Sequence, residues 1–144
     1  MFRGEFSHNL DAKWRLILPQ KFRDGLGDRF IITRGLDDCL FVYGLADWER
    51  FELKVRDMPV TDVKLRQFVR FFFGGAFETE ADAQGRTIIP AHLREHASLV
   101  RDVVSIGVPG RVEIWGKENW TKYNQSNRNS VDEDLARYIT EIGF

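Results

Sequence analysis

Two short segments of the chain place an aspartate and an arginine four residues apart, followed by three mostly apolar residues and a proline. The first is Asp11-Ala-Lys-Trp-Arg15 and the second is Asp82-Ala-Gln-Gly-Arg86. An aspartate in a turn can hold a nearby arginine by charge-assisted hydrogen bonds. An arginine can read guanine through O6 and N7 in the major groove of DNA. One copy would fit a salt bridge that only fixes the turn, whereas two aligned copies favour recognition.

The motif recurs because the chain is an internal duplication. The two motifs are offset by 71 residues, and Gly44 and Gly116, each followed by a tryptophan four residues later, are offset by 72. A period of about seventy residues exceeds the usual solenoid repeat and indicates two half-size units packed together. We expect a first repeat at 1–73 and a second at 74–144.

Each repeat is expected to open with two β-hairpins, since short β-branched and aromatic segments alternate with turn signals. The first hairpin would join residues 2–9 to residues 16–18 across the Asp-x-x-x-Arg turn. Pro109-Gly110 suits the centre of a type II turn between two later strands. These later hairpins are expected at 30–33 with 40–43 and at 103–106 with 112–115.

Two helices should follow in the first repeat. Apolar residues recur at helical spacing over 48–58, with Asp47 placed to accept hydrogen bonds from the amides of the first turn. Pro59 ends this helix. A second helix is expected from about Thr61 to the glycine pair at 74–75, where the repeats join.

The second repeat should carry a shorter helix at 117–124, then a polar linker at 125–129. Ser130 and Glu133 fit a capping box that opens a last helix. Its acidic surface is expected to be solvated. The apolar face of this last helix would consist of Leu135, Tyr138, Ile139 and Ile142.

Charge is unevenly distributed along a chain of net charge −1. Residues 1–23 hold five basic and two acidic side chains, whereas 129–144 have a net charge of −3. Any binding to nucleic acid would therefore need a local basic patch, multiplied by oligomerisation. On this charge argument Lys13 and Arg3 are candidate phosphate contacts. The single Cys39, the lack of a secretory pattern and the lack of a membrane-length apolar run predict a cytoplasmic protein.

Several motifs together resemble a known family. They are Met1-Phe-Arg-Gly, the two Asp-x-x-x-Arg turns, Arg70-Phe-Phe-Phe-Gly-Gly-Ala76 and Arg111-Val-Glu-Ile-Trp115. In these the chain resembles the MraZ transcriptional regulators and, more distantly, the AbrB/MazE swapped-hairpin barrels. The resemblance implies an α+β, barrel-rich fold in which two AbrB-like repeats form a double-split β-barrel flanked by helices.

The resemblance also implies a function. It implies a ring-shaped homo-oligomer that binds tandem, short, G-rich repeats in promoter DNA and represses its own cell-division and cell-wall gene cluster, associated with the nucleoid. Arg15 and Arg86 would read the bases, with Asp11 and Asp82 as their orienting partners. No cofactor, no small-molecule substrate and no membrane partner are implied.

One position departs from the family pattern. The residue before the motif arginine is usually glycine, as in Gly85, but it is Trp14 in the first repeat. Glycine there permits a positive φ. Trp14 must either adopt that conformation or change the turn that places Arg15. A tryptophan that covers its own hairpin is the expected outcome. The alternatives are that it stacks on a sugar or base, or that it packs against a neighbouring subunit.

Other chemistry finds little support in the sequence. His92 and His96 have a spacing that can bind a metal, but no completing ligand is evident. No phosphate-binding loop or nucleophile set is supported by position, so we expect neither an enzyme nor a metal site. The alternative function is an antitoxin-like module that binds a protein through its Phe-rich helical surface. Indifference to DNA would favour that alternative.

Overall fold

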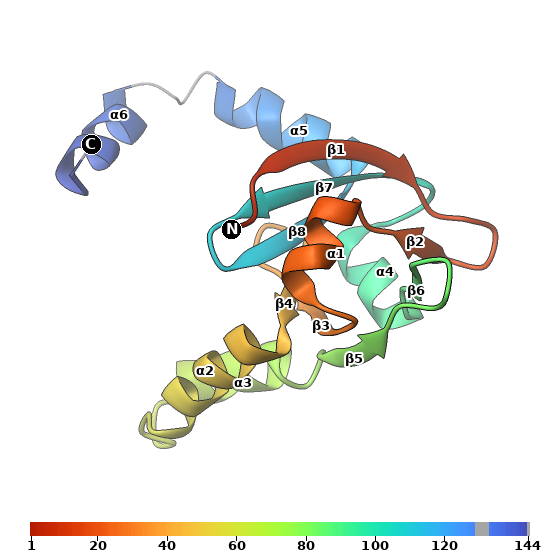
Figure 1. Cartoon of the computed structure of the whole chain (residues 1–144). Coiled ribbons are helices and arrows are strands. Elements are labelled where there is room, and N and C mark those ends of the chain that lie inside the picture. The colour runs from red at the N-terminus through yellow and green to blue at the C-terminus, as the bar shows by residue number, and fades with distance from the viewer. Residues whose placement is uncertain (129–132, 144) are drawn as a thin grey trace.

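The computed structural model describes residues 1–128 and 133–143, and the same order of elements occurs twice (Figure 1). The first repeat contains β1 (Gly4–Asn9), β2 (Arg15–Ile17), α1 (Gln20–Leu26), β3 (Arg29–Arg34), β4 (Leu40–Gly44), α2 (Leu45–Arg56) and α3 (Val63–Phe72). The second contains β5 (Phe77–Glu80), β6 (Arg86–Ile88), α4 (Ala91–Ala97), β7 (Asp102–Val108), β8 (Arg111–Gly116), α5 (Lys117–Arg128) and α6 (Glu133–Glu141).

The strands form a six-stranded antiparallel sheet, in the order β1-β7-β8-β4-β3-β5, and a two-stranded ribbon of β2 with β6. The first strand of each repeat pairs with the third strand of the other repeat, as β1 does with β7 and β5 with β3. The α+β class and the duplication are thus confirmed. Closure of the sheet into a barrel stays a prediction.

The hairpins β3–β4 and β7–β8 are present as expected, and Gly110 in the second turn has a φ of 84°. The hairpin expected between 2–9 and 16–18 is wrong, because β1 pairs with β7 and β2 pairs with β6. The chain does reverse at the motif, where the Asp11 N–H donates to the Arg15 carbonyl over 2.9 Å. The short β2 then pairs with its equivalent strand, which places the two inward side chains, Leu16 and Thr87, opposite each other.

The helices of the first repeat differ from expectation at one end. α2 begins at Leu45 after Gly44, with no capping side chain, and the Asp47 carboxylate accepts from Arg50 instead of from a backbone amide. The predicted Asp47 cap is therefore wrong, because the helix starts at Leu45 and Asp47 lies inside its first turn. α3 ends before the glycine pair, and Asp62 caps it by accepting from two backbone amides of its first turn.

One helix of the second repeat, α5, extends beyond the prediction. α5 runs to Arg128, so the polar linker expected from residue 125 is wrong over residues 125–128. Polarity alone does not end a helix, because Gln, Ser, Asn and Arg have only small propensity penalties relative to alanine. The predicted capping box at Ser130 lies outside the described residues.

Two apolar clusters hold the fold together. The main one draws on both repeats, and Phe22, Ile32, Leu93 and Ile114 in it are at most 1% exposed. Burying each such side chain contributes roughly 1.5–3 kcal/mol. In the second cluster, Phe72 of α3 packs on Trp48 of α2 at a ring separation of 5.3 Å. Both rings also contact Tyr43 of β4, so this cluster seats α2 and α3 against the sheet.

The ribbon and the later helices lie on different sides of the molecule. In Figure 1 the β2–β6 ribbon is at the right, whereas α2 with α3 and α5 with α6 leave the sheet toward the left. Among the described helices, none is both long and apolar enough to cross a membrane.

Candidate nucleic-acid interface

The two motif arginines stand on one ribbon, formed by antiparallel pairing of β2 with β6. Leu16 and Thr87 are opposite each other at its centre and are buried. Successive side chains of a strand point to opposite faces, so the neighbours of these two residues share the outer face. The outer face thus carries Arg15 and Ile17 from β2 and Arg86 and Ile88 from β6.

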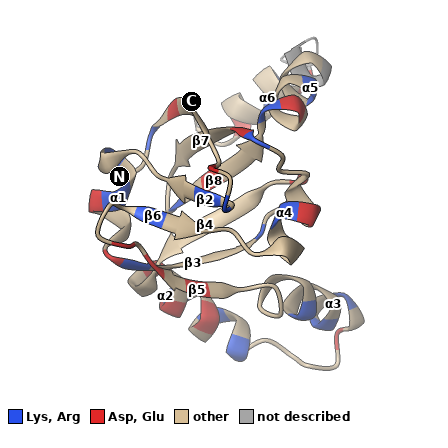
Figure 2. Ribbon diagram, turned by 90° about the vertical axis from the view of Figure 1, so that its right-hand side faces the viewer, with Lys and Arg blue, Asp and Glu red and all other residues tan. Residues whose placement is uncertain are grey.

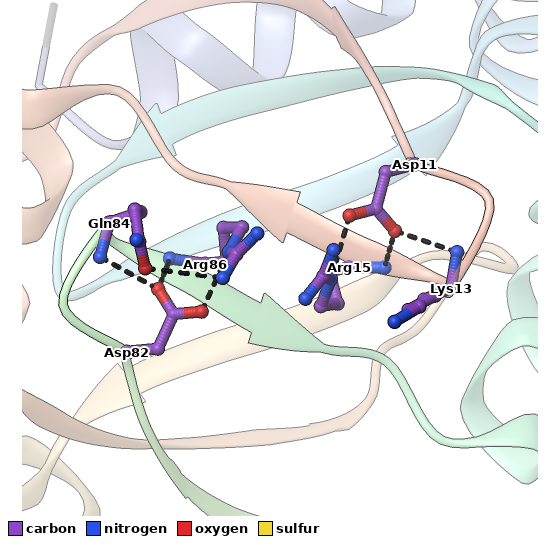
Figure 3. Close-up of polar contacts among 6 residues, drawn as sticks. All are labelled: Asp11, Lys13, Arg15, Asp82, Gln84 and Arg86. Atoms are coloured by element: carbon purple, nitrogen blue, oxygen red, sulfur yellow. Dashed lines mark hydrogen bonds and ion pairs between the residues drawn. The ribbon is translucent and has the colours of Figure 1, made fainter.

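Asp11 holds the first turn through three hydrogen bonds (Figure 3). Its Oδ1 accepts from the backbone N–H groups of Lys13 and Arg15, both at 2.9 Å. Its Oδ2 accepts from the Arg15 Nε over 2.7 Å. One carboxylate therefore fixes both the backbone of the turn and the plane of the guanidinium group.

The second turn repeats this geometry. Asp82 Oδ1 accepts from the backbone N–H of Gln84 at 2.9 Å and of Arg86 at 2.8 Å, and its Oδ2 accepts from Arg86 Nε at 2.7 Å. Figure 3 shows the two Asp–Arg pairs related by an approximate two-fold axis, with both arginines near the middle of the ribbon. The structure therefore brings together the four motif residues that the sequence singled out.

Hydrogen bonds hold the pKa of both aspartates below the usual value. For Asp11 the main cause is the backbone N–H of Arg15, followed among the lowering effects by its side chain. For Asp82 the same two groups of Arg86 act in the same order. Both carboxylates are therefore ionised at neutral pH, as the pairing with arginine requires.

Trp14 adopts the strained conformation and leaves the turn unchanged. Its φ is 61°, close to the 78° of Gly85 in the second turn, and Arg15 keeps the same contact with its aspartate that Arg86 has. The expectation that Trp14 covers its own hairpin is wrong, since β1 and β2 form none. Its ring lies instead against the Arg94 guanidinium of α4, with the Cζ atom 4.1 Å from the ring centroid.

Two further arginines touch the turns, and sequence reasoning missed them. Arg94 of the second repeat contacts Trp14 of the first, and Arg23 of the first repeat approaches Gly85 of the second. A Cβ atom on Gly85 would lie 2.4 Å from Arg23 Nη1, so a larger residue there would require the end of the Arg23 side chain to move. The available signal was that Arg23 and Arg94 occupy equivalent places in the two repeats.

The two candidate phosphate contacts differ in position. Lys13 lies on the first turn, exposed and beside Arg15 (Figure 3). Arg3 precedes β1, beside Gly107, at the end of the strand remote from the turn. The six residues of β1 span about 20 Å. The structure therefore does not bring Arg3 to the ribbon. Figure 2 looks onto the ribbon and shows basic segments on β2 and β6 in the middle of this face.

The two histidines of α4 each contact a backbone carbonyl. The Nε2 of His92 lies 3.0 Å from the Gly75 oxygen, and that of His96 lies 2.9 Å from the Gly35 oxygen. A carbonyl only accepts, so Nε2 carries the proton in both rings. Within residues 1–128 and 133–143, no three His, Cys, Asp or Glu side chains group in a way that could hold a metal ion. The two histidines therefore link α4 by hydrogen bonds to the loops that contain Gly35 and Gly75.

The fold and the site define a class of protein. It is a duplicated α+β protein in which both repeats contribute to one surface, the β2–β6 ribbon with its two Asp–Arg turns. A family model described as "MraZ protein, putative antitoxin-like" matches residues 1–71 and again residues 72–142. The transcriptional regulator MraZ of Acetivibrio thermocellus is 51% identical over 144 residues, which is the full length of both chains. That of Desulforamulus reducens is 53% identical over 142 residues, covering 99% of each chain. The chain belongs to the MraZ family, and the resemblance read from its motifs is confirmed.

Proposed function

We propose that the chain is a sequence-specific, double-stranded DNA-binding regulator of transcription whose reading element is the β2–β6 ribbon. The observation that carries this proposal is the pair of aspartate-held arginines on one outer face of the ribbon. A two-stranded ribbon fits the major groove of B-DNA. The relatives named as transcriptional regulators support the same function.

The chemistry of this face suits guanine. Because Nε of Arg15 is bound to Asp11, the terminal Nη groups are the donors that remain to contact a base. Such a pair of donors matches O6 and N7 of guanine. Arg15 lies opposite Ile88 and Arg86 opposite Ile17, so the two arginine Cα atoms are about 8–9 Å apart. That spacing covers two to three base steps of about 3.4 Å, as a short G-rich repeat requires.

The exposed isoleucines extend this face. Ile17 and Ile88 are 48% and 49% exposed, beside the arginines. Apolar side chains in the major groove contact the thymine methyl group. A short element that mixes guanine with thymine would therefore use the whole outer face.

One ribbon carries few basic groups, so an oligomer that presents several ribbons would increase the number of contacts with DNA. The last helix, α6, follows α5 as α3 follows α2, yet its apolar face stays exposed. Tyr138 and Ile142 are 57% and 55% exposed, whereas Phe72 of α3 is 2% exposed. Exposed apolar faces of this kind mark interaction sites. We assign this face to a second copy of the chain, in a ring-shaped homo-oligomer.

A ring gives the site its affinity. Several ribbons that bind tandem repeats raise the effective concentration, so affinity rises steeply with repeat number and falls steeply with salt. The helices that would join the subunits leave on the side away from the ribbon (Figure 1). Straight duplex meets only part of an undistorted ring, so only some subunits engage at once. The regulator would repress its own cell-division and cell-wall gene cluster, at the nucleoid in the cytoplasm.

A second candidate function is an antitoxin-like module that binds another protein. The exposed apolar face of α6 and the words "antitoxin-like" in the family description favour it. In that case α6 would cover a foreign partner, and the ribbon would contribute nothing to binding. Catalysis is not part of either proposal.

Selection of a randomised duplex pool on the purified protein tests the proposal. Wild type should enrich a spaced G-rich element, and Arg15→Ala should lose it with fold and oligomer intact. Arg50→Ala is the matched control, since Arg50 is an exposed arginine paired with an aspartate on α2, away from the ribbon. No enrichment by wild type, or equal binding by both variants, would exclude the ribbon as the reading element and favour the protein-binding module.

A further inference from the structure

The two turns differ at their middle positions, which are Lys13 and Trp14 in one and Gln84 and Gly85 in the other. Gln84 Oε1 accepts a hydrogen bond from Arg86 Nη2 over 3.1 Å (Figure 3). Lysine has no acceptor. Within the described part of the chain, the Nη atoms of Arg15 have no hydrogen-bonded partner. The two arginines are thus held alike at Nε and unlike at Nη.

This difference bears on base reading. Two-point contact with guanine uses two N–H donors of one guanidinium group. In Arg86 one of the two remaining nitrogen atoms already donates to a protein acceptor. DNA must displace or share that bond at Arg86, whereas it meets no such competitor at Arg15. Arg86 therefore gives up a hydrogen bond to Gln84 when it binds a base. Arg15 has no such bond to lose.

The first turn also offers contacts that the second lacks. Lys13 adds a positive charge where Gln84 is neutral, and the ammonium group suits a phosphate. Trp14 is 38% exposed and is held by Arg94, where Gly85 has no side chain. A fixed aromatic surface beside a reading arginine can pack on a deoxyribose. Each of these differences strengthens the first turn relative to the second.

We propose that the two turns of one chain are unequal readers of DNA. The first turn supplies the dominant contact, and Gln84 restrains Arg86. The operator element is therefore asymmetric, with one strongly and one weakly read guanine per chain, although the ribbon is nearly two-fold symmetric. This inference rests on the proposed DNA-binding function and goes further by ranking its two halves.

Binding of the selected duplex across a salt titration tests the ranking. Arg15→Ala should weaken binding at least fivefold more than Arg86→Ala does. Lys13→Gln, which copies the second turn into the first, should weaken binding and lower the salt slope by about one per engaged chain. Lys54→Gln, an exposed lysine of α2, is the matched control and should change neither quantity.

A variant at position 84 must separate two effects: loss of the hydrogen bond that restrains Arg86, and addition of a positive charge. Gln84→Met removes the acceptor without adding charge, so binding should tighten about twofold to threefold at an unchanged salt slope. Gln84→Lys should tighten binding further and raise the slope. Weaker binding by Gln84→Met, or equal losses for the two arginine variants, would overturn the inference while leaving DNA binding established. Failure of wild type to select any duplex would instead overturn the proposed function. Circular dichroism and sedimentation confirm that each variant keeps its fold and size.

Discussion

Glycine should be more favourable than alanine at position 14, and the structure sets the size of the effect. A non-glycine residue in the left-handed region costs about 1–2 kcal/mol, and the φ of Trp14 is 61°. Glycine relieves this cost but loses about 0.5–1 kcal/mol through greater freedom in the unfolded chain. Trp14→Gly should therefore be more stable than Trp14→Ala by about 0.5–1 kcal/mol. Both variants lose the Arg94 contact, so that loss cancels in the comparison.

Urea denaturation at equal protein concentration measures this difference. Ala12 in the same turn is the control, because its φ is not in the left-handed region and Ala12→Gly should be destabilising. Opposite signs at positions 12 and 14 of one turn would show that φ, and not local flexibility, determines stability. An alanine at position 14 that matches or exceeds glycine in stability would refute the reasoning.

Three further outcomes are expected. Carboxyl NMR should place the pKa values of Asp11 and Asp82 below 3.8, so the stabilisation of the turns is present above that pH and is lost as pH falls through the folded-state values; midpoints at or above 3.8 would contradict the hydrogen bonding. Cys39 is buried, its thiol donates to the Leu36 carbonyl, and burial raises its pKa, so a thiol reagent should label it only on unfolding. Rapid labelling of folded protein would be inconsistent with this. Ile139→Asp should reduce the sedimenting size by charging the exposed face of α6, and an unchanged size would assign that face to another role.

Local features of the fold could be predicted from the sequence. The β3–β4 and β7–β8 hairpins and the end of α3 depend on turn signals and caps within a few residues. The partners of β1 and β2 could not be predicted. The alternation of side chains along a strand tells which face is buried but not which other strand lies beside it. The duplication adds to the ambiguity of strand pairing, because each strand has a similar candidate partner in each repeat.

In the candidate site, too, local contacts could be predicted and contacts between distant segments could not. The Asp11–Arg15 contact spans four residues and was evident from spacing alone. The approach of Arg94 to Trp14 spans two repeats and depends on the β2–β6 pairing. Arg3 is a candidate phosphate contact only because of the local charge of the sequence, and local charge contains no information about distance in the fold. Only its place before β1 shows that it lies far from the turn.

The exchange of strands makes each repeat depend on the other. The pairs β1–β7, β2–β6, β3–β5 and β4–β8 all join the two repeats. Residues 1–73 alone therefore leave β1 and β2 without partners and β3–β4 as an isolated hairpin. We expect this fragment to be unfolded as a monomer. Because the repeats are equivalent, a second copy of 1–73 can offer the missing pairings, so any folded form should be a dimer.

Sedimentation with circular dichroism distinguishes these states. Adding residues 74–144 should convert the fragment into a folded heterodimer, since the second repeat supplies the missing native partners of β1, β2, β3 and β4. A folded monomer of 1–73 would mean that β1 and β2 can also pair within their own repeat. In that case the reading surface would not require both halves of the chain, and the two turns could act independently.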